Sequence, residues 1–133
     1  MSLRTDLNGF RVKKTTKHPA IYLIDEGRKR WIPNPTVYDL LFRDWGGIIL
    51  EIDIDKIPTG SAIPQDAILI RFGSKPAIYL LDGVQPNQVK RHITSPSVMD
   101  HYNFDWDQVV VLPTQIEGSF ATGNPINNPN FYT

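Results

Sequence analysis

The residues that could carry catalysis or hold a metal are few in this chain of 133 residues. Its three histidines, His18, His92 and His101, lack the spacing of a metal-binding pair and have no glutamate between them. The chain has no cysteine, so it offers neither a thiolate nor a disulfide. No serine stands in a nucleophile elbow, and no glycine-rich loop opens a helix. These observations predict a protein that is not an enzyme and uses no cofactor.

Two carboxylates are the remaining candidates for metal binding. Asp53 and Asp55 alternate with isoleucines in "EIDIDKIP", so an extended segment would place both on one face, where they could hold a hard cation. The related segment "LPTQIEGS" keeps only Glu117, and the spaced acids and glycine of a calcium loop are absent. A solvated strand edge is therefore the favoured interpretation, and no metal site is predicted.

Aromatic side chains are the stronger candidates for binding, because sugar and peptide binders use them as flat platforms. Trp31 alternates with the apolar Ile32, so we expect it to be exposed. Trp45 and Trp106 adjoin apolar runs, and we expect both to belong to the core. The candidate ligand-binding residues are Trp31, Arg30, Tyr22, Tyr79, Arg91 and His92.

Two opposite-charge pairs flank predicted hairpins. Asp25 and Arg30 could pair across one hairpin, and Asp82 and Arg91 across the other. As exposed pairs they would contribute at most about 1 kcal/mol. The functional alternative is a polar ring around a ligand groove.

The chain contains one segment twice. "PAIYLIDEGRKRWIPNP" begins at Pro19, and "PAIYLLDGVQPNQVKRHITSP" begins at Pro76. Later fragments match in the same order, down to Thr-Gly at residues 59–60 and 122–123. Extra residues in the second copy lie among Gly, Pro and Asn, which indicates a turn. The copies span residues 8–64 and 65–127, with tails at 1–7 and 128–133.

Each copy carries signals for three strands, a helix and a fourth strand. The strand segments are "FRVKK", "AIYLID" and "RKRWI", then "AILIRF", "AIYLLD" and "VKRHI". A turn at Glu26 and Gly27 joins one hairpin, and a loop at residues 83–88 joins the other. Asn34 and Ser95 each precede a proline, as helix N-caps do.

The last segments of each copy complete the predicted unit. "GGIILEI" and "QVVVLP" are continuous apolar runs, which predict a buried fourth strand. Gly60 and Gly123 then supply a backbone conformation that other residues resist. A copy of about 55 residues is small for independent stability. We therefore predict an α+β fold of two tandem β-β-β-α-β repeats, with mainly antiparallel sheet, packed about a pseudo-twofold as one cooperative unit.

Charge and hydropathy narrow the range of partners. Lysine and arginine total 14, as do aspartate and glutamate, so there is no overall field to hold nucleic acid. No apolar run approaches the roughly 18 residues of a membrane span, which argues against membrane insertion. The start "MSLRTDLNG" lacks the apolar stretch of a signal peptide.

The duplicated segments resemble a repeat of secreted and cell-surface bacterial proteins. Its pattern is a Tyr-Leu-Ile-Asp strand, a Lys-Arg-x-Ile strand, a helix begun by proline, an aromatic-Asp-Trp turn and a valine-rich strand closed by Thr-Gly. The resemblance covers nearly all of residues 8–127. It implies an extracellular or cell-surface module, strung in arrays beside wall-acting or carbohydrate-acting domains, and it carries no assigned activity.

Together these observations predict a noncatalytic binding module whose ligand is a bacterial surface carbohydrate. The alternative is a structural spacer or a protein-interaction repeat. The expected partner is accordingly a polysaccharide or another protein domain, and the oligomeric state stays open.

Overall fold

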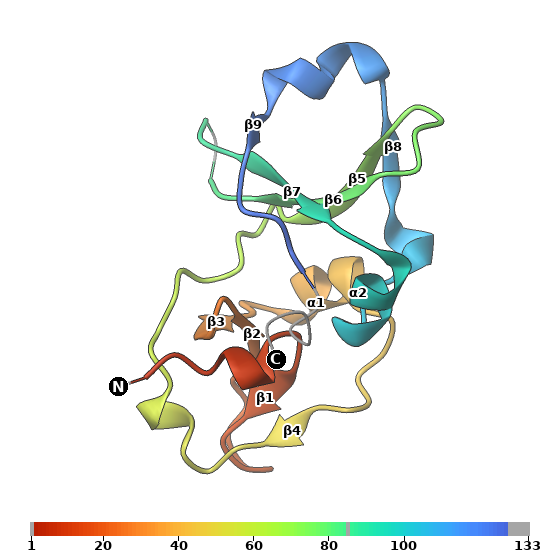
Figure 1. Ribbon diagram of the computed structural model, residues 1–133. Coiled ribbons are helices and arrows are strands. Elements are labelled where there is room, and N and C mark those ends of the chain that lie inside the picture. Colours follow the sequence, from red (N-terminus) through yellow and green to blue (C-terminus); the bar gives the residue numbers. More distant parts are fainter. Residues whose placement is uncertain (1, 85, 128–133) are drawn as a thin grey trace.

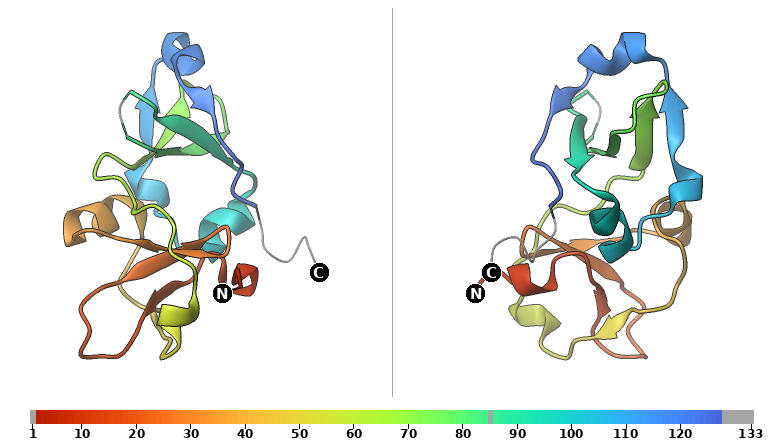
Figure 2. Two further views of the ribbon diagram at one scale, coloured as in Figure 1. Left: turned by 90° about the vertical axis from the view of Figure 1, so that its left-hand side faces the viewer. Right: turned by 45° about the vertical axis from the view of Figure 1, so that its right-hand side comes forward.

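The computed structural model describes residues 2–84 and 86–127 and has a mixed α+β fold with two mostly antiparallel sheets, as predicted. The sheets lie at opposite ends of the molecule, and two short helices lie at the level between them (Figures 1 and 2). Gln85 of the predicted longer loop and the predicted tail at 128–133 lie outside the described residues.

The first sheet has the strand order β3-β2-β1-β4. Strand β2 pairs antiparallel with both β1 and β3, whereas β4 runs parallel to β1. Glu26 and Gly27 have φ values of 53° and 76°, as a type I′ turn requires, so the predicted tight hairpin is confirmed. The strands are β1 (Arg11–Lys13), β2 (Tyr22–Asp25), β3 (Arg28–Trp31) and β4 (Ile49–Leu50).

The second sheet has the order β8-β5-β6-β7-β9. Strand β6 pairs antiparallel with β5 and β7, and β8 runs parallel to β5 as β4 does to β1. Strand β9 adds a parallel edge beside β7. The strands are β5 (Ile68–Phe72), β6 (Ile78–Asp82), β7 (Val89–Ile93), β8 (Val110–Leu112) and β9 (Ala121–Thr122).

The helices begin where the sequence predicts. The Asn34 side chain accepts a hydrogen bond from the backbone N–H of Val37, and Ser95 does the same for Val98. A proline follows each cap at the first helical position. The helical elements are α1 (Pro35–Leu41) and α2 (Pro96–His101), with 3₁₀ turns η1 (Thr5–Leu7), η2 (Ile54–Lys56), η3 (Trp106–Gln108) and η4 (Thr114–Ser119).

The largest cluster of buried side chains draws on both sequence copies. It includes Leu23 and Leu41 from the first copy and Leu69 and Leu80 from the second. The segments that follow the two helices also meet, because Phe42 and Phe104 form an antiparallel bridge. The largest apolar cluster is therefore shared by the two copies, beside one smaller cluster in each.

The fourth strands differ from the sequence prediction. Ile49 is only half-buried and Leu50 is exposed, and in the second sheet Val110 and Val111 are both exposed. Strands β4 and β8 each stand at a sheet edge, with a neighbour on one side only. Their apolar runs indicate strand propensity and not burial.

Gly60 and Gly123 serve a purpose other than the predicted one. Neither is among the residues with positive φ, so neither supplies an unusual backbone conformation. Instead they let the chain pass close to a strand. A Cβ at Gly60 would lie 3.2 Å from Cβ of Arg28, and one at Gly123 would lie 2.7 Å from Cγ2 of Val89.

The close approach at Gly123 generates a stability prediction. Gly123→Ala should lower the free energy of unfolding by about 1–3 kcal/mol, because an added methyl group overpacks a filled site. Gly118→Ala is the matched control, since a Cβ there has no atom within 4 Å. Urea denaturation of both variants measures the difference. Equal stabilities would contradict the packing role.

Candidate functional site

Four charged side chains are buried where the two sheets face each other. Arg30 of β3 and Arg91 of β7 meet Asp25, the last residue of β2, and Asp82, the last residue of β6. None of the four is more than 8% exposed. A buried charge is costly unless it is paired and hydrogen-bonded. We call these four residues the ion network.

Each arginine forms a bidentate ion pair with the aspartate of the other copy. Nη1 and Nη2 of Arg30 both lie 2.8 Å from an oxygen of Asp82. Nη1 and Nη2 of Arg91 lie 2.6 Å and 3.1 Å from the oxygens of Asp25. Pairing within a hairpin is by a single nitrogen, at 2.9 Å and 3.1 Å. The two predicted pairs were expected to be exposed, but all four side chains are buried. The sequence also did not predict that each arginine pairs with the aspartate of the other copy.

The remaining nitrogen of each arginine holds the segment that passes over it. Nε of Arg30 donates to the carbonyl of Ser61, and Nε of Arg91 donates to the carbonyl of Asn124, both at 2.8 Å. Each of these carbonyls comes directly after the glycine of a Thr-Gly pair. The Thr-Gly motif thus brings backbone acceptors against the ion network.

The lysine before each arginine also donates to backbone carbonyls. Nζ of Lys29 donates to the carbonyl of Ile57 at 2.6 Å, and Nζ of Lys90 donates to that of Phe120 at 2.9 Å. These carbonyls follow the 3₁₀ turns η2 and η4. The repeated Lys-Arg pair therefore fixes a turn with its lysine and joins the network with its arginine.

Contacts within the ion network shift the pKa values of Asp82, Arg30 and Arg91. Burial alone would raise the pKa of Asp82, but the hydrogen bond and charge of Arg30, with the charge of Arg91, lower it below its ordinary value. Burial would lower the pKa of both arginines, yet the partner carboxylates raise it. Asp82, Arg30 and Arg91 consequently stay charged at neutral pH.

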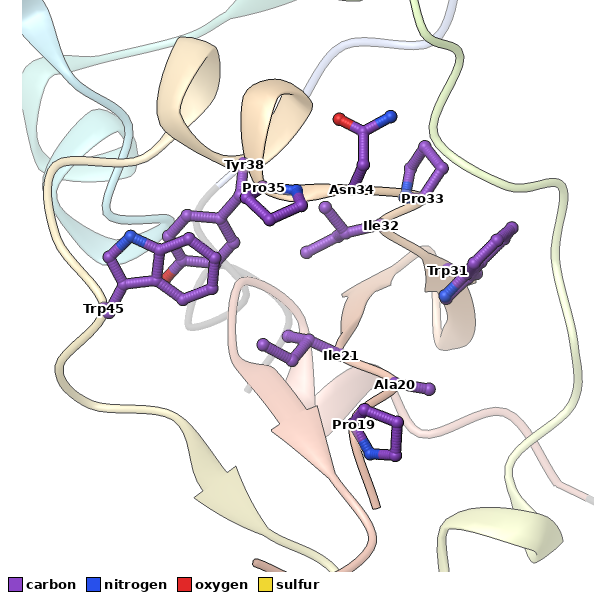
Figure 3. Close-up of a pocket in the computed structure, with 10 residues that line it drawn as sticks. All are labelled: Pro19, Ala20, Ile21, Trp31, Ile32, Pro33, Asn34, Pro35, Tyr38 and Trp45. Carbon is purple, nitrogen blue, oxygen red and sulfur yellow. The ribbon is translucent and has the colours of Figure 1, made fainter. Parts of the chain in front are cut away.

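A groove opens on the first copy between two tryptophans. Figure 3 shows Trp31 and Trp45 on opposite sides, with Ile21 and Ile32 between them. The cavity volume is about 360 Å³, and both indoles are 46% exposed. The lining residues are Pro19, Ala20, Ile21, Trp31, Ile32, Pro33, Asn34, Pro35, Tyr38 and Trp45. We call this space the first groove.

Trp31 and Trp45 test two expectations. The predicted exposure of Trp31 is confirmed. The predicted burial of Trp45 was wrong, because the residue is 46% exposed. Its indole lies flat over the buried ring of Tyr38, with 3.8 Å between centroids and 16° between planes. Only one indole face is covered in this way. Nε1 of Trp45 donates to Oδ1 of the exposed Asp39 at 3.0 Å.

A second groove occupies the corresponding place on the other copy. Its cavity volume is about 310 Å³, and His92 stands there where the first groove has Trp31. Trp106 lines this groove at 44% exposure, so its predicted burial was also wrong. Nε1 of Trp106 lies 3.5 Å from Oδ1 of Asp100. The lining residues are Pro76, Ala77, Ile78, His92, Ile93, Thr94, Ser95, Pro96, Met99 and Trp106.

The other candidate residues lie away from the grooves. Arg30 and Arg91 belong to the ion network, because successive residues of a strand face opposite sides and Arg30 therefore points away from Trp31. Tyr22 pairs in register with Trp31 and packs in a small apolar cluster. The Tyr79 ring lies 5.4 Å from that of His92. Of the predicted residues, Trp31 therefore lines the first groove and His92 lines the second.

The opposite walls were missed. Tyr38 and Trp45 complete the first groove, and Trp106 completes the second. A signal was present, since Trp45 is followed by Gly46 and Gly47, a pair typical of exposed turns. Two aspartates cap the turns that follow them: Oδ1 of Asp44 accepts from the N–H of Gly46, and Oδ1 of Asp105 accepts from the N–H of Asp107 at the start of η3.

The carboxylates considered for metal binding do not form a shared face. Residues Ile54–Lys56 form the 3₁₀ turn η2, so the extended alternation of Asp53 and Asp55 was wrong. Asp55 pairs with Lys14 at 2.6 Å, and Asp53 lies 3.8 Å from Lys56. Across residues 2–84 and 86–127, no three His, Cys, Asp or Glu side chains are grouped to hold a metal ion.

Comparison with known proteins yields no relative. No protein-family model matches the chain, and no curated protein or solved structure matches it. In the part of the chain that the structure describes, no helix has the length and apolar character needed to cross a membrane.

The ion network generates a stability prediction. Arg91→Leu should lower the free energy of unfolding by about 3–5 kcal/mol, because it leaves buried carboxylates without their partner. Arg4→Leu is the control: Arg4 forms an exposed two-nitrogen pair with Asp6, which contributes at most about 1 kcal/mol. Urea denaturation compares the two. A loss of under about 1 kcal/mol in Arg91→Leu would contradict the network's role.

Asp82 generates a pH prediction. Its pKa in the folded protein lies below the ordinary value of about 3.9, so its contribution is present above that pH and is lost as the pH falls through the lowered pKa. Urea denaturation in steps from pH 7 to pH 2 should therefore show a fall in stability below about pH 4. Asp82→Asn should be less stable at pH 7 and should fall less steeply in acid. Parallel profiles for the two proteins would refute this.

Proposed function

We propose that the chain is a noncatalytic binding module and that its first groove holds a saccharide of a bacterial cell surface. The observation that carries the proposal is the pair of exposed indoles, Trp31 and Trp45, on either side of one apolar hollow. Large exposed apolar groups that gather around a concave site are typical of ligand binding.

The chemistry of the first groove suits a pyranose ring. One face of a sugar ring presents C–H groups that stack on an indole, while its hydroxyls need polar partners at the rim. The exposed Asp39 stands beside Trp45 and provides carboxylate oxygens there. The floor of Ile21 and Ile32 excludes water beneath the ring.

A protein ligand is the second candidate, and one observation favours it. Pro19, Pro33 and Pro35 contribute to an almost wholly apolar lining, which resembles the aromatic and proline-lined grooves that receive extended peptides. In that case the chain would be a protein-interaction repeat or a spacer between domains. A saccharide panel and a peptide panel separate the two functions.

For the architecture, we propose two tandem β-β-β-α-β repeats packed about a pseudo-twofold. The support is the exchange of partners in the ion network, in which Arg30 takes Asp82 and Arg91 takes Asp25. The order β3-β2-β1-β4 and the order β7-β6-β5-β8 also agree strand for strand. A duplicated unit would then present two grooves from one rigid body, at a cell surface.

The proposed function generates a binding prediction. Chitohexaose, cellohexaose and soluble peptidoglycan glycan fragments are titrated while indole fluorescence is recorded. We expect at least one to bind, with Kd between micromolar and millimolar. Trp31→Ala should weaken that binding at least about fivefold, because a stacking contact contributes about 1 kcal/mol. Its Tm should stay within a few degrees, as for other surface changes.

Ile52→Ala removes a side chain that is 73% exposed and does not line either groove, so it should leave affinity unchanged. If none of the saccharides binds while a proline-rich peptide does, the protein-interaction function replaces the saccharide function. If Trp31→Ala binds as tightly as the natural protein, the first groove is not the site.

A further inference from the structure

We infer that Arg11 is a positioning residue that fixes Trp45 through Tyr38 and so prepares the first groove, but not the second, for its ligand. The inference rests on the proposed function for its affinity readout. Its structural readout, the setting of the Trp45 indole, does not depend on any ligand.

Arg11 is a buried cation without a carboxylate partner among the described residues, and its Cζ lies 5.8 Å from the centroid of the Phe42 ring. It is only 6% exposed, and within residues 2–84 and 86–127 it forms no ion pair. Its Nε has no hydrogen-bond partner there. Arg30, by contrast, is met by two carboxylates and Arg91 by three. A buried charge of this kind costs stability, so its presence calls for a reason other than stability.

The other copy shows that the fold does not need this arginine. In the register of the sheets, Arg11 stands opposite Leu23, and Leu69 stands opposite Leu80. Leu23 and Leu80 are matching residues of the duplicated segments, so Leu69 takes the place of Arg11. Leu69 is fully buried. An apolar side chain therefore fills the equivalent site in the same kind of sheet.

The partner of Arg11 differs between the copies as well. Tyr38 of α1 corresponds to Met99 of α2, and each lines its groove. The first copy thus has Arg11 with Tyr38, where the second has Leu69 with Met99. This paired exchange of a polar couple for an apolar couple singles out the first groove.

Arg11 fixes the two groups that set the position of Trp45. Its Nη1 donates to the Tyr38 hydroxyl at 2.5 Å and to the Asp44 carbonyl at 3.2 Å. The Tyr38 hydroxyl in turn donates to the same carbonyl at 2.6 Å. Burial raises the pKa of this hydroxyl, so it keeps the proton that it donates. Gly47 leaves room for the guanidinium, since a Cβ there would lie 3.1 Å from Nη2.

The consequence is a defined wall of the groove. Trp45 directly follows the held carbonyl and lies flat on the held ring, at 3.8 Å and 16°. Among the described residues, Trp106 makes no ring contact, and Met99 has no hydroxyl to hold. A side chain fixed before binding loses less freedom on binding. The first groove is therefore better preorganised than the second, in which Trp106 keeps an Nε1 contact with Asp100 but has no stacking partner among the described residues.

The experiment converts the first copy to the second by the double substitution Arg11→Leu with Tyr38→Met. The three indole Nε1–H resonances of Trp31, Trp45 and Trp106 are recorded by NMR, and the affinity for chitohexaose is measured. We expect the Trp45 resonance to shift or broaden while that of Trp106 stays in place. We also expect chitohexaose to bind at least tenfold more weakly, with Tm unchanged or raised because a buried charge is gone.

A second variant guards against misfolding. Tyr38→Phe keeps the ring under the indole and removes only the hydroxyl, so it should give a smaller shift of the same resonance. If Trp45 keeps its resonance in Tyr38→Phe, or if the double variant binds chitohexaose as the natural protein does, the inference is overturned. If the natural protein binds no saccharide but Trp45 responds in Tyr38→Phe, the positioning role stands and the saccharide function fails.

Discussion

Four buried charges connect the two copies of the duplicated segment. Asp25 and Asp82 each lie between two guanidinium groups, and the two-nitrogen contacts run from one copy to the other. Removing any one of the four leaves an unbalanced buried charge, which is far more costly than losing an exposed pair. The shared apolar core can form in this register because the charges beside it are satisfied across the same boundary.

What the two copies keep and what they change have different explanations. The kept motifs serve the ion network: Lys-Arg supplies the turn-binding lysine and the pairing arginine, and Thr-Gly brings the backbone acceptors within reach. The changed residues lie at the grooves, where Trp31 becomes His92, Tyr38 becomes Met99 and Arg11 becomes Leu69. The residues that agree between the copies serve the fold, and we propose that the residues that differ serve binding.

Local signals in the sequence predicted the elements, whereas partners across the molecule could not be predicted. The Glu26–Gly27 turn, the helix caps and the central strands depend on neighbouring residues, and they stand as predicted. The pairing of Arg30 with Asp82 depends on how the two copies face each other, which no local pattern contains. The exposure of Trp45 was mispredicted because it depends on Tyr38, a residue of α1 on which one face of the indole stacks.

The claim that the ion network makes the two copies one cooperative unit is tested most directly by native-state hydrogen exchange. The slowest amides of β2 and of β6 should report the same free energy of opening, equal to that of global unfolding, because neither sheet can open without exposing charges that the other one pairs. If one sheet opens at a clearly lower free energy while the other stays protected, the copies are independent units and the claim is wrong.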